Sequence, residues 1–287
     1  WEMCDPNLRL ARTLEVCPNL ARLYAQRMQE RPCSLERPWS MVVVWDDFTP
    51  GSLSHPLTHL KTMVLAYNFR EVGAAALGVG STWLVPVAVR SRYMAKAEGG
   101  LSACLVTYLK THLMGDLSIQ HVGVAFKVDG EIFMLYARLT NLMSDGEGLK
   151  LGLDVFGHAG INACVRCMNV LKKNSGLVHR RPGFVEIGCA DSRDFILRKQ
   201  VDLLADVEDL EDAHSQVVAG TMTQQRFQNI EKGSGIHFNP SGLLFSAEMR
   251  TLFSIMDVIT EDWMHGALQQ GTLNIACQRM LLASHAK

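Results

Sequence analysis

An uninterrupted apolar run at residues 41–45, Met-Val-Val-Val-Trp, sets the first constraint on how this chain folds. The run is rich in β-branched valine and leads into Asp46, Asp47 and then Phe-Thr-Pro-Gly. This pattern predicts a central strand followed by a turn. Two further strand-like runs, at residues 61–69 and 83–89, lie between glycine-rich segments. Three consecutive strands of this kind favour an antiparallel meander.

The next part of the chain changes from strand to helix and back. Residues 96–114 carry apolar side chains at helical spacing, and two more apolar runs follow at residues 121–128 and 132–142. Three strands, a helix and further strands suit an α/β fold of the ribonuclease-H-like kind, a mixed sheet flanked by helices.

Helical patterns dominate both ends of the chain. Residues 1–40 predict one or two short amphipathic helices broken at Pro18 and Pro32, and residues 202–223 and 248–283 are also expected to be helical. We therefore expect an N-terminal helical segment at 1–40, a catalytic-type core at 41–155, a zinc-binding loop region at 156–200, and a mainly α-helical insertion or extension at 201–287.

Composition adds constraints on location and partners. The 287 residues are 48% apolar, enough for a sizeable core, and the net charge of -1 carries no overall signature of nucleic-acid binding. Positive charge is local: residues 150–200 contain nine Lys or Arg against four acids, whereas residues 202–212 hold six acids and no basic residue. This asymmetry indicates either a surface that faces nucleic acid or charged faces that are simply solvated.

Eight scattered cysteines predict a reducing, intracellular location. No apolar stretch is long enough to predict a membrane span.

Aspartates after the expected strands are the candidate catalytic residues. Asp46 directly continues the first strand, and Asp145 follows the apolar run that ends near residue 144. Two carboxylates at one sheet edge can bridge a pair of Mg²⁺ ions that promote phosphoryl transfer. Asp47 and Asp154 are the alternatives. Each of the two main candidates could instead have a purely structural role. Asp46 would then be a turn residue and Asp145 a helix cap.

A cysteine pair, Cys164 and Cys167, has the spacing of half a tetrahedral zinc site. The remaining ligands would be His179 and Cys189, or else His158. The alternative is that both cysteines are ordinary buried or free thiols.

A basic stretch between Cys167 and Cys189 suits contact with a phosphate backbone, and its candidate residues are Lys172, Lys173, Arg180 and Arg181. Further along, Asp262 and His265 lie three residues apart, a pair that in many helices only forms a hydrogen bond or a cap.

Taken in order, these blocks resemble eukaryotic cut-and-paste DNA transposases of the CACTA-like and Plavaka-like superfamilies. Trp45 to Gly51 is similar to their first-aspartate motif, and Ser144-Asp145-Gly146-Glu147 with the later Cys164-Val165-Arg166-Cys167 looks like their second aspartate and trailing cysteine pair. Asp262-Trp263-Met264-His265 matches their Asp-x-x-His signature, which lies within an insertion.

The resemblance implies a nuclear DNA transposase core with a two-Mg²⁺ site held by Asp46 and Asp145, a structural Zn²⁺ loop, DNA as partner, and self-association. Such families complete the triad with a later Glu, and no acid occurs in residues 266–287. We therefore expect either a fragment truncated before that Glu or a decayed copy that no longer cuts DNA, and in both cases a chain that is inactive alone. The alternative is a non-catalytic, transposon-derived, zinc-containing protein that binds DNA through residues 150–200.

Overall fold

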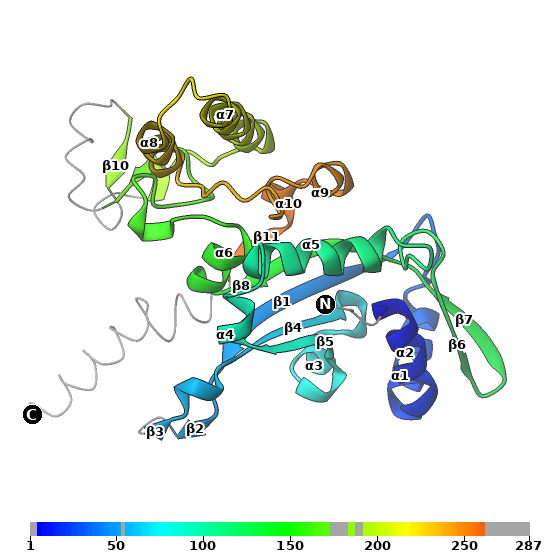
Figure 1. The fold of residues 1–287 in the computed structure, drawn as a ribbon. Helices are drawn as coiled ribbons and strands as arrows, with labels where there is room; N and C mark the ends of the chain where they lie inside the picture. Colours follow the sequence, from blue (N-terminus) through cyan, green and yellow to red (C-terminus); the bar gives the residue numbers. More distant parts are fainter. Residues whose placement is uncertain (1–4, 53–54, 173–182, 187–191, 262–287) are drawn as a thin grey trace, which may run out of the picture. The chain divides into compact units, whose positions relative to one another are not determined.

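The computed structural model describes residues 5–52, 55–172, 183–186 and 192–261. The chain divides into two compact units (Figure 1). Unit 1 comprises residues 1–97, 104–148 and 258–287, and unit 2 comprises residues 98–103 and 149–257. The long helix α5 (Gly100–Leu113) therefore contributes its first turn to unit 2 and the rest to unit 1.

A five-stranded mixed sheet forms the centre of unit 1, in the order β11-β8-β1-β4-β5. The expected meander is confirmed, since β1 pairs antiparallel with β4 and β4 pairs antiparallel with β5. On the other side of β1, β8 and then β11 run parallel to it. The prediction of an α/β fold with a mixed sheet flanked by helices is confirmed at this level. The strands are β1 (Trp39–Phe48), β4 (Thr62–Phe69), β5 (Leu84–Arg90), β8 (Ala137–Ser144) and β11 (Ile259–Glu261).

The central strand is longer than the sequence pattern predicts. β1 pairs with β4 as far as Phe48, opposite Thr62, so Asp46 and Asp47 are strand residues. The interpretation of Asp46 as a turn residue is therefore wrong. Antiparallel pairing with a long β4 extends the strand beyond its apolar run, because backbone hydrogen bonds do not depend on side-chain polarity. Short elements then connect β1 to β4, namely β2 (Gly51–Ser52), β3 (His55–Pro56) and η1 (Thr58–Leu60).

The N-terminal region forms two helices, α1 (Pro6–Val16) and α2 (Pro18–Glu30), as the apolar spacing predicts. Asp5 caps α1 by accepting hydrogen bonds from the backbone N–H groups of Asn7 and Leu8. Tyr24 of α2 packs against Trp39 and Phe69 of the sheet, with ring centroids 5.8 and 5.9 Å away. These contacts place α2 on the aromatic core of unit 1.

The segment before β8 differs from the expected single strand at residues 132–142. The chain breaks at Tyr136, so that β6 (Val124–Val128) and β7 (Glu131–Leu135) form a separate hairpin, and β8 begins at Ala137. Asp129 and Gly130 form the hairpin turn with φ angles of 48° and 96°. Positive φ at both central residues matches the right-handed twist of the two strands. The smaller elements of unit 1 are η2 (Arg70–Val72), α3 (Ala74–Leu77), η3 (Gly80–Thr82) and α4 (Ser91–Met94).

Helices and loops make up most of unit 2. The expected helix at 202–223 is observed as α7 (Gln200–Val218), which buries Leu203, Val207 and Leu210. Around it the rings of His214, Phe227, Phe238 and Phe245 form a contiguous cluster. The other elements are α6 (Gly146–Gly152), which begins in unit 1, η4 (Gly157–Ala159), β9 (Val170–Leu171), β10 (Val185–Glu186), η6 (Ser192–Asp194) and α8 (Gln224–Ser234).

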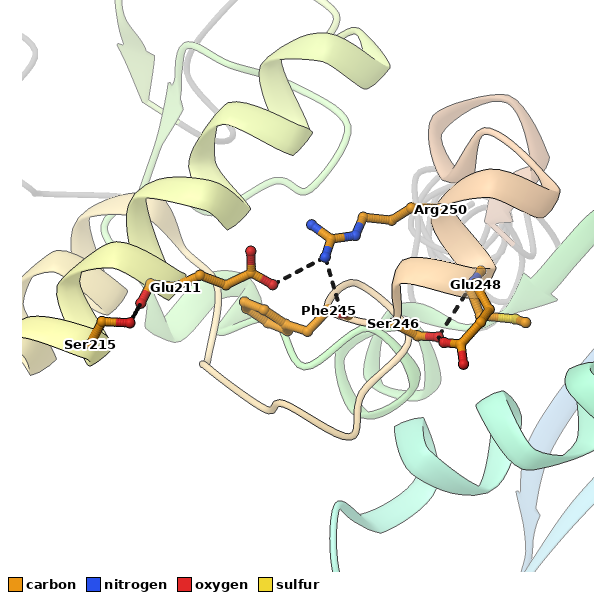
Figure 2. A network of polar contacts seen from close by, with 7 residues as sticks. Glu211, Ser215, Phe245, Ser246, Glu248 and Arg250 are labelled. Carbon is orange, nitrogen blue, oxygen red and sulfur yellow. Dashed lines mark hydrogen bonds and ion pairs between the residues drawn. The ribbon is translucent and has the colours of Figure 1, made fainter. Parts of the chain in front are cut away.

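The helix expected from residue 248 onward is interrupted. The chain instead forms α9 (Ala247–Leu252), α10 (Ile255–Val258) and then strand β11, which joins the sheet of unit 1. Ser246 caps α9, and Arg250 donates to the Glu211 carboxylate of α7 at 3.1 Å and to the carbonyl oxygen of Phe245 at 3.2 Å (Figure 2). The helical prediction failed at 259–261 because pairing with β8 is a long-range contact that local spacing does not encode.

Candidate functional site

The two main candidate aspartates come at the ends of two neighbouring interior strands, β1 and β8. The strands are parallel, with Val42 opposite Asn141, Val43 opposite Leu142 and Val44 opposite Met143. Asp145 directly follows the end of β8 at Ser144, and this register, if continued for two residues beyond Val44 and Met143, would put the backbones of Asp46 and Asp145 opposite each other. Neighbouring strands lie about 4.8 Å apart, and residues two apart on a strand share a face of the sheet. Both aspartates therefore come at the same end of these parallel strands, Asp46 within β1 and Asp145 immediately after β8.

Two hydrogen bonds fasten the ends of these strands together. The Ser144 hydroxyl donates to the carbonyl oxygen of Trp45 at 2.6 Å, and the indole Nε1 of Trp45 donates to the carbonyl oxygen of Gly148 at 2.8 Å. Trp45 is fully buried, so its N–H needs this protein acceptor. We call these two bonds the Trp45–Ser144 clasp. It holds the residues that immediately precede Asp46 and Asp145.

Gly148 is required by the close approach within this clasp. A Cβ atom at this position would lie 1.8 Å from the Ser144 hydroxyl and 3.0 Å from Oδ1 of Asp145. Sequence reasoning missed the roles of Ser144 and Gly148. The only available signal was the unusual presence of two glycines, Gly146 and Gly148, inside a short helical segment.

Asp145 also caps helix α6. Its Oδ1 accepts a hydrogen bond of 2.6 Å from the backbone N–H of Gly148, three residues later. This is the geometry of a helix N-cap, so the structural interpretation of Asp145 is confirmed. A carboxylate has acceptor sites on both oxygens, and capping engages only one of them. Capping and metal binding are therefore compatible at this residue.

Asp46 and Asp47 have different surroundings. Oδ2 of Asp47 lies 2.7 Å from the Lys61 ammonium group, and its Oδ1 accepts a hydrogen bond from the Ser91 hydroxyl. With 18% of its side chain exposed, Asp47 is held in structural contacts on the β4–β5 side of the sheet. Asp46 is exposed, and its Oδ1 accepts from the backbone N–H of Asp47 at 2.7 Å. Of the two, Asp46 is the one that continues the register toward Asp145.

Asp154, the other alternative, belongs to unit 2 and has a different environment. Its Oδ2 accepts a hydrogen bond of 3.0 Å from the Asn239 amide, and a Cβ on Gly242 would come within 2.4 Å of the same oxygen. Burial raises the pKa of Asp154 to about 6, although hydrogen bonds from Ser102 and Asn239 oppose the rise. The residue also adopts a φ of 53°, in the left-handed region. Asp154 thus forms part of a packed polar cluster within unit 2.

The cysteine pair lies in a loop that Asn169 organises. Cys167 is buried and forms an isolated backbone bridge with Leu197, while Cys164 is partly exposed. The Asn169 side chain donates to the carbonyl oxygens of Gly183 and Asp194 and accepts from the backbone N–H of Ile196. Three segments of residues 156–200 are therefore held together by one buried amide. Sequence reasoning missed this residue, which only tertiary contacts distinguish from an ordinary loop asparagine.

Within the described ranges, no group of three or more His, Cys, Asp or Glu side chains is arranged to hold a metal ion. Of the basic candidates, Lys172 is described, and its backbone N–H donates to the carbonyl oxygen of Ile161. The side chain of His158 is not described. The remaining predicted site residues lie outside the described residues, namely Lys173, His179, Arg180, Arg181, Cys189, Asp262 and His265.

Comparison with known proteins gives no family assignment: no protein-family model matches the sequence, and no curated protein matches it. In the part of the chain that the structure describes, no helix combines the length and apolar character needed to cross a lipid bilayer.

Proposed function

We propose that unit 1 is a ribonuclease-H-like core of the cut-and-paste DNA transposase type, with Asp46 and Asp145 as metal ligands. The observation that carries the proposal is the parallel pairing of β1 and β8 up to Val44 and Met143, a register that would put Asp46 opposite Asp145 if it continued for two residues. The order of elements supports it as well: an antiparallel meander, a helix, and then a strand added in parallel beside the first strand.

The donor set fits magnesium. Mg²⁺ prefers oxygen ligands and is commonly held by one or two carboxylates, with water and substrate phosphates completing its coordination. Asp46 and Asp145 offer that pair on rigid strand ends. Bound Mg²⁺ would activate a water or a 3′-hydroxyl and stabilise the leaving oxygen of a phosphodiester. The protein's own contribution would be positioning, because the Trp45–Ser144 clasp holds the residues that immediately precede the two aspartates.

Metal binding tests this proposal without requiring activity. We expect Mn²⁺, a paramagnetic substitute for Mg²⁺, to bind the chain, and both Asp46→Asn and Asp145→Asn to weaken binding at least tenfold. Asn is nearly as good an N-cap as Asp, so Asp145→Asn should leave α6 intact. Asp47→Asn is the matched control and should retain Mn²⁺ binding. Equal binding in all four proteins would overturn the assignment.

A structural zinc ion is the second part of the proposal. Cys164 and Cys167 would supply two thiolates, and the other ligands would come from outside the described residues, with His179 and Cys189 as the candidates. Elemental analysis of the purified chain should find close to one zinc per molecule, reduced in Cys164→Ser. A metal-free chain that folds normally would return both cysteines to the role of ordinary thiols.

DNA is the proposed partner, the nucleus the proposed location, and self-association the expected assembly mode. The alternative function, a non-catalytic zinc-containing DNA-binding protein, differs in one measurable respect. It requires DNA binding that falls steeply with salt but is unaffected by Asp46→Asn and Asp145→Asn, in a chain that binds no Mn²⁺.

A further inference from the structure

The β6–β7 hairpin of unit 1 is a two-stranded sheet of its own. It extends beside α1 and α2, away from the five-stranded sheet (Figure 1). Both helices pack against β6, whereas the extensive contacts of β7 are made with β6. Among the described residues, no strand pairs with the outer edge of β7.

The tight turn determines which backbone groups of β7 point outward. Glu131 lies opposite Val128, across the two-residue turn. In such a hairpin the two residues that flank the turn exchange both backbone hydrogen bonds, and bonded pairs then alternate with non-bonded pairs along the strands. Every second residue of β7, starting from Glu131, therefore bonds to β6. The N–H and C=O groups of Ile132 and Met134 point to the open edge.

This edge lacks the features that usually protect an edge strand. The sequence of β7 is Glu-Ile-Phe-Met-Leu, without proline, lysine or a bulge, and 73% of Ile132 and 36% of Met134 are exposed. The edge strand β5 of the larger sheet differs, because it contains Pro86, whose carbonyl oxygen accepts a hydrogen bond from Arg9 of α1. An apolar edge as open as that of β7 is suited to pairing with another strand.

β7 is complementary to a second copy of itself. In an antiparallel pair centred on Phe133, Ile132 of each copy lies opposite Met134 of the other. Both of these pairs are of the bonded type, so every outward N–H and C=O group of the two strands finds a partner. Glu131 lies opposite Leu135 of the second copy, so the two carboxylates are at opposite ends of the pair and do not repel each other.

Side-chain packing is consistent with the same arrangement. Residues opposite each other share a face of the sheet, so the exposed side chains of Ile132 and Met134 cover each other across the pair. On the other face, the Phe133 ring stacks on Phe126 at 5.5 Å, and Phe126 contacts Tyr24 of α2 at 6.4 Å. The second copy continues this aromatic row, since its Phe133 lies directly opposite the first.

We propose that two copies of this chain associate through β7, forming a four-stranded antiparallel sheet from their two hairpins. Five residues on each side make a smaller contact than the interfaces of about 1,200–2,000 Å² found in stable complexes, so the dimer is weak and depends on concentration. The inference is independent of the proposed metal site, because neither Asp46 nor Asp145 belongs to the hairpin.

Sedimentation velocity of the whole chain at increasing concentration tests the proposal. We expect a monomer–dimer equilibrium that Ile132→Glu weakens about tenfold or more, because the two new carboxylates lie diagonally on one face, about 7–8 Å apart. Within each monomer the new carboxylate lies opposite Lys127, so the hairpin should remain folded, which thermal unfolding of the dilute chain checks. Ile196→Glu, the same change at an exposed position of unit 2, should dimerise normally.

A second substitution tests the register. Adding Met134→Lys to Ile132→Glu sets an ammonium group opposite each new carboxylate of the other copy, and should restore dimerisation to within about threefold of the wild type. Loss of the dimer in Ile132→Glu without this rescue would overturn the antiparallel register. A wild-type chain that stays monomeric, or a dimer unaffected by Ile132→Glu, would overturn the proposal; the first result would leave the edge to an extended segment of another protein. Mn²⁺ binding should be the same in all of these variants, so the metal site is judged separately.

Discussion

The indole Nε1 of Trp45 donates a 2.8 Å hydrogen bond to the carbonyl oxygen of Gly148, across 103 residues of sequence. It connects the end of β1 to the first turn of α6. Together with the Ser144 hydroxyl, which donates to the carbonyl oxygen of Trp45, it ties the two strand ends from which Asp46 and Asp145 project. The hydrogen bonds beside the candidate site are thus made by residues other than its proposed ligands. A substitution can remove one of these bonds without removing a ligand.

Trp45→Phe should reveal the role of this support. The change leaves the Gly148 carbonyl oxygen without its donor, and we expect a loss of about 1–3 kcal/mol in the free energy of unfolding, measured by denaturant titration. Trp83→Phe is a suitable control because Trp83 makes a similar bond to the carbonyl oxygen of Leu77. Both variants should be less stable, but only Trp45→Phe should weaken Mn²⁺ binding. Equal Mn²⁺ affinity in the two variants would argue against a positioning role.

Gly148→Ala should be far more damaging than Gly146→Ala. A Cβ at 148 collides with the Ser144 hydroxyl, whereas at 146 it meets no atom within 4 Å. Overpacking of this kind costs about 1–3 kcal/mol, while an alanine in open helical space is neutral or slightly stabilising. Thermal unfolding of the two variants measures the difference. Similar midpoints would mean that the close approach at Gly148 relaxes without cost.

The two roles of Asp145 separate in a pair of substitutions. Asp145→Ala removes both the N-cap and the carboxylate, and should destabilise the chain by about 0.5–2 kcal/mol. Asp145→Asn keeps a capping oxygen and should remain close to wild-type stability. Both should lose Mn²⁺ affinity, as measured by water proton relaxation. If only the Ala variant loses Mn²⁺, the cap and not the carboxylate charge supports the site.

Stability should depend on pH through Asp154. Its folded pKa of about 6 lies above the ordinary aspartate value of 3.8, so between these pH values the folded state holds a proton that the unfolded state has already released. The contribution of this residue to stability is therefore most favourable below about pH 4, and it declines as pH rises to about 6. The decline amounts to about 1–3 kcal/mol, given 1.36 kcal/mol per unit of pKa shift and partial exposure of the group.

Asp154→Asn removes that titration. Unfolding free energies measured from pH 4 to pH 8 should show a smaller decline in this variant than in the wild type, with the difference developing between about pH 4 and 6. Parallel pH profiles for the two proteins would contradict the assignment of a raised pKa to Asp154.

Local sequence patterns were sufficient for the central strand, its meander and four of the five longest helices. The valine-rich run predicted β1, and apolar residues at helical spacing predicted α1, α2, α5 and α7. These predictions succeeded because each element buries one face or stripe, and the required periodicity is present within a few turns or a few residues of the chain. The same local information correctly offered helix capping as a role for Asp145.

Pairing between distant segments had to come from the tertiary structure. The register of β1 against β8 joins residues about 100 positions apart, and the packing at the end of β1 brings Asp47 to Lys61 and Ser91. The strand at 259–261 and the open edge of β7 are likewise products of packing. Such features depend on which backbone groups and side chains meet after the chain has folded, and a local window of sequence contains only one side of each contact.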